Sequence, residues 1–239
     1  MPGPATRQRR IGDLRARIAQ REGAFARCQV YPCENRPTAS SGEGLNRLYC
    51  RKHIEHYRRH GSYVKKSYGS GELRPYRAAA LQWFREHATD PAVSTALGRI
   101  REHLSASGRP VEAFRLAGLS PAQRARNVWA TLAKRRIKPA EIAAAFLVVR
   151  MRLRDDPQPD RHAEYRNVQA AKLLHRMAGG THKRWERERD DGSVEVTELH
   201  RHPVSRGLVL RVLGQSLADA CRGLPIPGQE APAANAPLR

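Results

Sequence analysis

Hydrophobic residues recur every three or four positions along much of this chain, which is the spacing that places them on one face of an α-helix. The clearest stripe includes Val93, Leu97 and Ile100. Another segment opens with Ser120 and Pro121, which are typical of a helix N-terminus. The pattern predicts helices over residues 78–87, 91–104, 111–117, 121–136, 139–154, 163–177 and 203–222.

Before the last of these helices, the pattern changes to two short extended segments. Residues 181–189 and 193–200 flank an Asp-Gly pair, Asp191-Gly192, which is a β-hairpin signal. Glu and Arg alternate along both segments, so we expect ion pairs across the strands. Trp185 is expected to anchor the hairpin to the last helix. The fold class is therefore mainly α, with one C-terminal β-hairpin near residues 181–200.

The first quarter of the chain has a different character. Residues 1–26 place apolar side chains at helical spacing among arginines, which predicts a basic amphipathic helix. The stretch up to residue 47 contains prolines, glycines and serines that disfavour a helix. Residues 48–60 suit a helix again, and Gly61 is placed to end it.

Composition and charge narrow the class of partner. Hydrophobic residues make up 40% of the chain but aromatic residues only 6%, so the core should be aliphatic and rich in alanine. The chain has 44 Lys and Arg against 23 Asp and Glu, a net charge of +21 that favours a polyanionic partner. The positive excess lies in the first two thirds of the chain.

Targeting signals do not stand out in the sequence. The basic N-terminus is not followed by the apolar run of a signal peptide. No stretch approaches the roughly 18 uninterrupted apolar residues of a membrane span. We therefore expect an intracellular, cytoplasmic protein, and in that environment clustered cysteines bind metal more often than they form disulfides.

Three of the four cysteines lie within 23 residues and a histidine follows them. Cys28 and Cys33 occupy a turn, while Cys50 and His53 are spaced to lie on one face of a helix's first turn. Two such pairs suit one structural zinc ion, and four protein ligands leave no open position for a substrate. The alternatives are ordinary buried cysteines, a disulfide, or His56 in place of His53.

The second ligand pair lies in a run that resembles a known family. The run is Arg47-Leu-Tyr-Cys50-Arg-Lys-His53-Ile-Glu-His-Tyr57-Arg-Arg-His-Gly61. Together with Cys28-x4-Cys33, it resembles the small CCCH treble-clef zinc fingers of phage and bacterial proteins. The resemblance implies a knuckle, a small hairpin and a helix around zinc, and association with DNA-handling proteins, including some near HNH endonucleases. It covers only residues 28–61, with a longer loop and Ile54 where the family often has tyrosine.

These observations divide the chain into five expected parts. The parts are a basic amphipathic helix (1–26), a treble-clef zinc module (27–61), a basic linker (62–76), a helical domain that includes the hairpin (77–224) and a disordered tail (225–239).

Basic residues on and after the zinc helix suggest what the module does. Each phosphate that a cation neutralises adds salt-dependent affinity for nucleic acid. Tyrosines among these cations can stack on unpaired bases, and Tyr57, Tyr63, Tyr68 and Tyr76 are the candidates. The expected nucleic-acid contacts are Arg47, Arg51, Lys52, Arg58, Arg59, Lys65 and Lys66.

We expect a non-catalytic nucleic-acid-binding protein of a phage or mobile element that prefers DNA to RNA. Residues 34–49 contain no histidine, unlike the hairpin of an HNH nuclease, and the acidic run 155–160 is interpreted as a solvated loop. One alternative is a structural or interaction protein whose zinc serves only folding. The other is a divergent HNH-type nuclease or its accessory.

Overall fold

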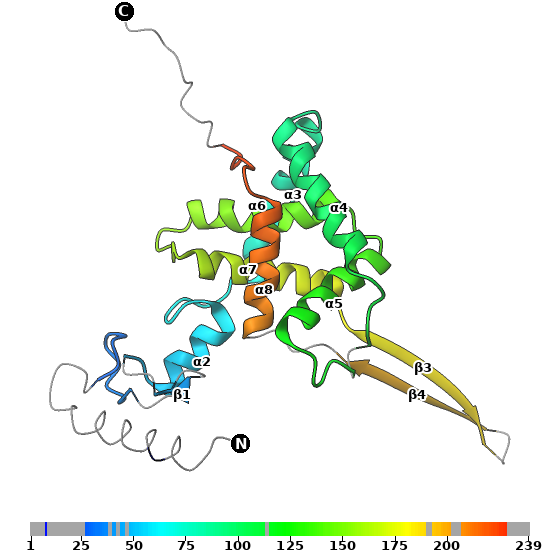
Figure 1. Ribbon diagram of the computed structural model, residues 1–239, viewed down its shortest axis with the longest axis horizontal. Coiled ribbons are helices and arrows are strands. Elements are labelled where there is room, and N and C mark those ends of the chain that lie inside the picture. Colours follow the sequence, from blue (N-terminus) through cyan, green and yellow to red (C-terminus); the bar gives the residue numbers. More distant parts are fainter. Residues whose placement is uncertain are drawn as a thin grey trace, which may run out of the picture. The chain divides into compact units, whose positions relative to one another are not determined.

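The structure is a computed structural model that describes residues 8, 27–37, 40–41, 44–45, 48–112, 115–189, 193–201 and 207–228. The chain forms two compact units, Met1–Tyr57 and Arg58–Arg239 (Figure 1). Apart from Gln8, the helix expected within residues 1–26 lies outside the described residues.

The first unit contains a two-stranded hairpin and the start of a helix. Strands β1 (Ser40–Ser41) and β2 (Gly44–Leu45) are antiparallel, with Ser40 opposite Leu45. Helix α2 (Arg51–His60) follows and crosses into the second unit, where Gly61 with a φ of 77° ends it. The predicted order of turn, hairpin and helix is thus confirmed.

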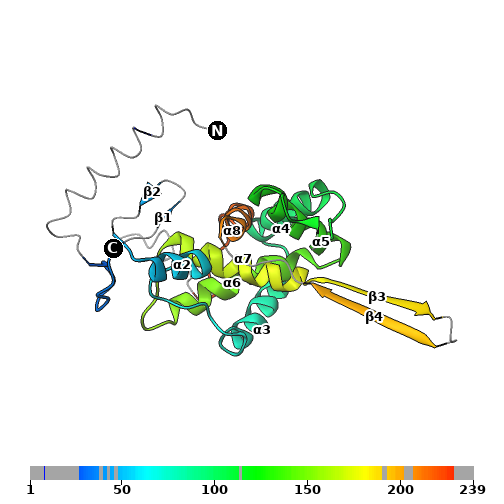
Figure 2. The same ribbon diagram turned by 90° about the horizontal axis from the view of Figure 1, so that it is seen from below.

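Six further helices lie in the described part of the second unit. They are α3 (Ser70–Glu86), α4 (Pro91–Ala106), α5 (Pro121–Lys134), α6 (Pro139–Arg154), α7 (Ala163–Ala178) and α8 (Leu208–Ala220). Helix α6 packs against α3, α4, α7 and α8 (Figures 1 and 2), and nine of its residues are buried. Its alanines allow neighbours on several sides to approach closely. The core is aliphatic, as the composition predicts.

Several helices start where the sequence predicts. Pro91, Pro121 and Pro139 each occupy the first turn of a helix, where a missing backbone N–H costs nothing. The Ser120 hydroxyl accepts from the Gln123 N–H, and the Gln123 side chain accepts from the Ser120 N–H. This reciprocal cap fixes the N-terminus of α5.

The predicted C-terminal hairpin is present and extends away from the helices of its unit (Figures 1 and 2). Strands β3 (Thr181–Glu188) and β4 (Val194–Arg201) are antiparallel, with Glu188 opposite Val194. An ion pair of 3.3 Å joins Arg189 to Glu195 across the turn. Trp185 is 48% exposed, so the expectation that it anchors the hairpin by burial was wrong.

Two segments of the second unit differ from expectation. The linker expected over residues 62–76 is wrong in its second half, because α3 begins at Ser70 and carries Pro75 in its second turn. Of the short helix expected over 111–117, the described residues show a 3₁₀ turn at Arg115, whose N–H donates to the Glu112 carbonyl at 2.9 Å. Before it, the Val111 N–H donates to the Asn127 side chain at 2.5 Å.

The C-terminal tail begins later than expected. Ile226 packs against the core, and the Pro227 carbonyl accepts a hydrogen bond from Arg154 at 2.5 Å. The expected disordered tail therefore cannot start at residue 225, and residues 229–239 lie outside the described part of the chain.

Candidate metal centre and basic helix

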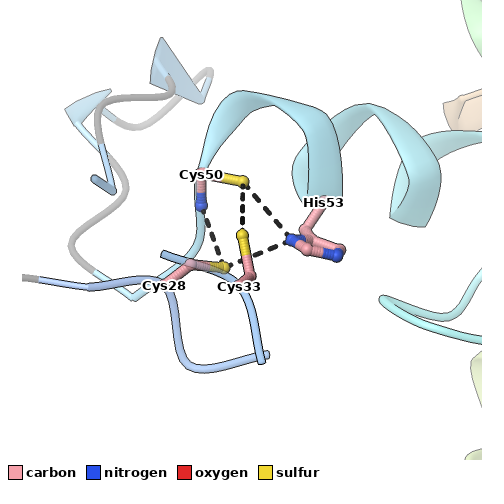
Figure 3. Close-up of side chains that lie close together, drawn as sticks. All are labelled: Cys28, Cys33, Cys50 and His53. Carbon is pink, nitrogen blue, oxygen red and sulfur yellow. Dashed lines mark hydrogen bonds between the residues drawn. The ribbon is translucent and has the colours of Figure 1, made fainter. Parts of the chain in front are cut away.

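Backbone hydrogen bonds shape the turn that carries the first two cysteines. The Cys33 N–H donates to the Val30 carbonyl at 2.7 Å, which closes the turn. The Cys28 N–H donates to the Asn35 carbonyl at 2.9 Å. The Gln29 N–H donates to the Leu48 carbonyl, also at 2.9 Å, which ties the turn to the segment before α2. These bonds bring the side chains of Cys28 and Cys33 together (Figure 3).

Helix α2 supplies the other two side chains. The Ile54 N–H donates to the Cys50 carbonyl at 3.0 Å, so Cys50 stands at the N-terminus and His53 lies in the first turn. Ile54, in the first turn of α2, is buried. Cys28 and Cys50 are also buried, whereas Cys33 and His53 are half-buried.

The four side chains converge on one point (Figure 3). Their ligand atoms all lie within 4.8 Å of one another. The Nδ1 atom of His53 is 3.3 Å from the Sγ atoms of both Cys28 and Cys50, and the Sγ atoms of Cys33 and Cys50 are 3.9 Å apart. Among the described residues, this group contains His53 and not His56. The cluster can therefore hold one metal ion.

Two N–H groups donate hydrogen bonds to sulfur atoms of the cluster. The Cys50 N–H donates to Cys28 Sγ, and the Asn35 side-chain amide donates to Cys33 Sγ, both at 3.4 Å. Such donors stabilise thiolates, which are the form that binds metal. Asn35 was missed by the sequence reasoning, although its position two residues after a ligand was a usable signal.

The protonation of the histidine also suits a ligand. Burial, followed by the charges of Lys52 and His56, lowers the pKa of His53 below its usual value. A lower pKa favours the neutral imidazole, which is the form that coordinates metals. All four cysteines of the chain are free thiols, so the disulfide alternative is not what the structure shows. Cys221 is fully buried in the core, as expected.

The expected nucleic-acid contacts are of three kinds: exposed cations, a residue outside the described part of the chain, and one lysine with a buried partner. Four exposed cations lie on α2, and Lys66 after the helix is exposed as well. Arg51 forms an ion pair of 3.0 Å with Glu55, and both side chains remain largely in solvent. Arg47 lies outside the described residues. The four cations on the helix are Arg51, Lys52, Arg58 and Arg59.

Lys65 does not behave like the other expected contacts. Its ammonium group lies 2.6 Å from a carboxylate oxygen of Asp156, and the lysine side chain is only 21% exposed. Tyr68 donates its hydroxyl to the same oxygen at 2.6 Å. Lys65 therefore has a structural partner and is poorly placed to meet a phosphate, so we withdraw it from the predicted set.

The same contacts correct the interpretation of the acidic run 155–160 as a solvated loop. Asp156 in that run is buried, with 7% of its surface exposed. Burial by itself would raise its pKa, but hydrogen bonds from Lys65, Tyr68 and the Gln158 N–H lower the pKa to about 2. The run contains a buried carboxylate that ties residues 65–68 to the end of α6.

The tyrosines are not equally available for stacking. Tyr68 is buried and packs edge-on against Tyr165, with ring centroids 5.8 Å apart. Tyr57, Tyr63 and Tyr76 are half-buried. The most exposed ring in the described part of the chain is that of Tyr31, at 94%, on the turn between the first two cysteines. The sequence reasoning passed over it.

None of the helices in the described part of the chain has both the length and the apolar character required to traverse a lipid bilayer.

Comparisons with known proteins add no family to this description. No protein-family model, curated protein or solved structure matches the chain.

Proposed function

We propose that Cys28, Cys33, Cys50 and His53 bind one structural zinc ion in a CCCH treble-clef finger. Three thiols and one imidazole form a donor set that suits zinc. Zinc bonds of about 2.3 Å to sulfur and about 2.0 Å to nitrogen give tetrahedral edges of about 3.8 Å between sulfurs and about 3.5 Å between sulfur and nitrogen. The cluster's distances of 3.9 and 3.3 Å lie within a few tenths of an ångström of these values.

We further propose that the protein binds nucleic acid without catalysis, and DNA in preference to RNA. The observation that carries this proposal is the basic stripe of α2, defined as Arg51, Lys52, Arg58 and Arg59, all exposed. An α-helix turns about 100° per residue, so these four positions fall within an arc of about 120°. The opposite side of the helix carries the metal ligand His53, and the buried Ile54 lies on the flank next to Arg58.

The two proposals depend on each other through the helix. The metal ligands fix the N-terminal turn of α2, and the stripe begins within that turn. Arginine suits the task because its planar guanidinium contacts a phosphate with two N–H groups. The resemblance of residues 28–61 to fingers of phage and bacterial proteins supports DNA as the ligand and a mobile element as the origin.

A salt series tests the nucleic-acid proposal. The logarithm of the affinity for a labelled DNA duplex should fall linearly with the logarithm of salt concentration, with a slope of roughly −0.9 per phosphate contacted. In the double variant Arg58→Gln/Arg59→Gln the slope should become shallower by the contribution of about two phosphate contacts. The matched control Arg85→Gln/Arg101→Gln removes two exposed arginines from α3 and α4 and should keep the slope.

The outcomes of this experiment are distinct. A flat salt slope for the wild-type protein on both a duplex and a single strand contradicts nucleic-acid binding and favours a protein whose metal serves only folding. Equal losses in the two double variants contradict the basic stripe as the contact surface. An RNA duplex of the same sequence, measured in parallel, tests the preference for DNA.

A further inference from the structure

The turn between Cys28 and Cys33 presents an aromatic ring to solvent. Tyr31 is 94% exposed, more than any other large hydrophobic side chain in the described part of the chain. Burying an aromatic side chain is a large favourable term in folding. A ring left almost wholly in water contributes little of this, so packing within its unit does not explain why a tyrosine is placed here.

The backbone around the ring is held in place. Tyr31 lies inside the turn that the Cys33 N–H closes on the Val30 carbonyl at 2.7 Å. Cys28 and Cys33 on either side belong to the metal cluster. A tyrosine has only two side-chain torsions to immobilise, so a ring on a fixed turn binds with a small loss of entropy. The geometry is that of a preorganised stacking platform.

Positive charge accompanies the ring within the same unit. Arg27 and Arg36 are exposed on the two sides of the turn. Arg27 lies 3.9 Å from Glu34, but both side chains are at least 74% exposed, so the pair is weak and solvated. Arg51 and Lys52 of the basic stripe also belong to this unit. Cations beside an exposed ring are the combination that binds single-stranded nucleic acid.

We propose that Tyr31 stacks on an unpaired base, so that the metal-binding turn selects single-stranded or locally opened nucleic acid. This inference rests on the proposed function and specifies its ligand. In a duplex, each base face is covered by its neighbours, and a lone ring gains access only by unstacking them. In a single strand the faces are open, and stacking on a protein ring contributes about 1–3 kcal/mol per base.

The test compares two labelled DNA probes with the full-length, metal-loaded protein. The probes are an oligothymidine and a duplex of the same strand length. Tyr31→Ala should lower the affinity for oligothymidine about 5- to 150-fold and leave the duplex affinity within about twofold, since the charge is unchanged. Tyr31→Phe keeps the ring and should bind both probes like the wild type. Metal content should be equal in all three proteins.

A second readout reports stacking directly. Replacing one base of a single strand by 2-aminopurine should give quenched fluorescence on binding to the wild-type protein and to Tyr31→Phe, but not to Tyr31→Ala.

Two results would overturn the inference, and a third separates it from the proposed function. Unchanged oligothymidine affinity in Tyr31→Ala refutes the stacking role. An equal loss for both probes refutes the preference for unpaired bases. A wild-type protein with no salt-dependent binding to either probe refutes the proposed function itself.

Discussion

Replacing Asp156 by asparagine should destabilise the helical unit. The carboxylate is buried and accepts hydrogen bonds from Lys65 and Tyr68, both at 2.6 Å. Asparagine removes the charge and leaves the lysine, only 21% exposed, without a carboxylate partner, although its ammonium group still donates to the Gln158 carbonyl at 2.6 Å. Breaking a buried pair in this way costs about 3 kcal/mol of unfolding free energy. The neighbouring Asp155 is exposed and pairs with Arg154 at the surface, so Asp155→Asn should cost less than about 1 kcal/mol.

The pH dependence of this effect has a defined sign. The pKa of Asp156 is about 2 in the folded protein, against a usual value of 3.8. A lowered carboxylate pKa stabilises the folded state above about pH 4, and this stability disappears as the pH falls through about 2. The difference of nearly two pKa units corresponds to about 2 kcal/mol. The gap between wild type and Asp156→Asn should therefore narrow by about that amount at low pH.

Tryptophan fluorescence in urea is a suitable assay. All three tryptophans lie in the second unit, so the signal follows that unit and not the metal centre. Each protein is unfolded at pH 7 and at successively lower pH, and the free energies are compared. The reasoning is refuted if Asp156→Asn and Asp155→Asn are equally stable at pH 7, or if the gap between wild type and Asp156→Asn does not depend on pH.

Two further predictions concern the metal centre and the packing of the helical unit. Cys50→Ser should lose stoichiometric zinc by elemental analysis, whereas Asn35→Ala should keep zinc with roughly 10- to 100-fold weaker affinity in a chelator competition. Stoichiometric zinc in Cys50→Ser would disprove the ligand set. Gly214→Ala should lower the melting temperature, because a Cβ there would overlap the Asn167 backbone where α7 crosses α8. Gly98→Ala in α4 meets no atom within 4 Å and should instead stabilise by about 0.5–1 kcal/mol, and equal melting temperatures for the two would contradict the close approach.

Local signals explain what the sequence predicted correctly. The N-termini of α4, α5 and α6 are marked by prolines, and the cap of α5 involves residues only three apart. The metal ligands likewise form two close pairs, each placed by its own turn or helix. The turn, the hairpin and the helix that carry them were therefore predictable.

Contacts between distant residues explain most of the errors. Lys65 and Asp156 lie 91 positions apart, and neither carries a local sign of its partner. Because of the same separation in sequence, the contact of residues 62–68 with Asp156 could not be predicted. These residues appeared to be a linker because they are rich in serine and lysine. Helix α3 starts upstream of Pro75, where Glu72 accepts from the Gly69 N–H and caps the first turn. In this segment, tertiary contacts and not local propensity determine which residues are helical.

The burial of Cys221 has a practical consequence for labelling the thiols of the candidate metal centre. This thiol is fully buried, and burial raises its pKa to about 12, so it is inert to alkylation in the folded protein. The other three cysteines all belong to the metal cluster. A thiol-reactive dye added to the native protein therefore reacts only with the three cysteines of the cluster. If the cluster binds zinc as proposed, uptake of the dye during treatment with a chelator measures the fraction of molecules that have lost the metal.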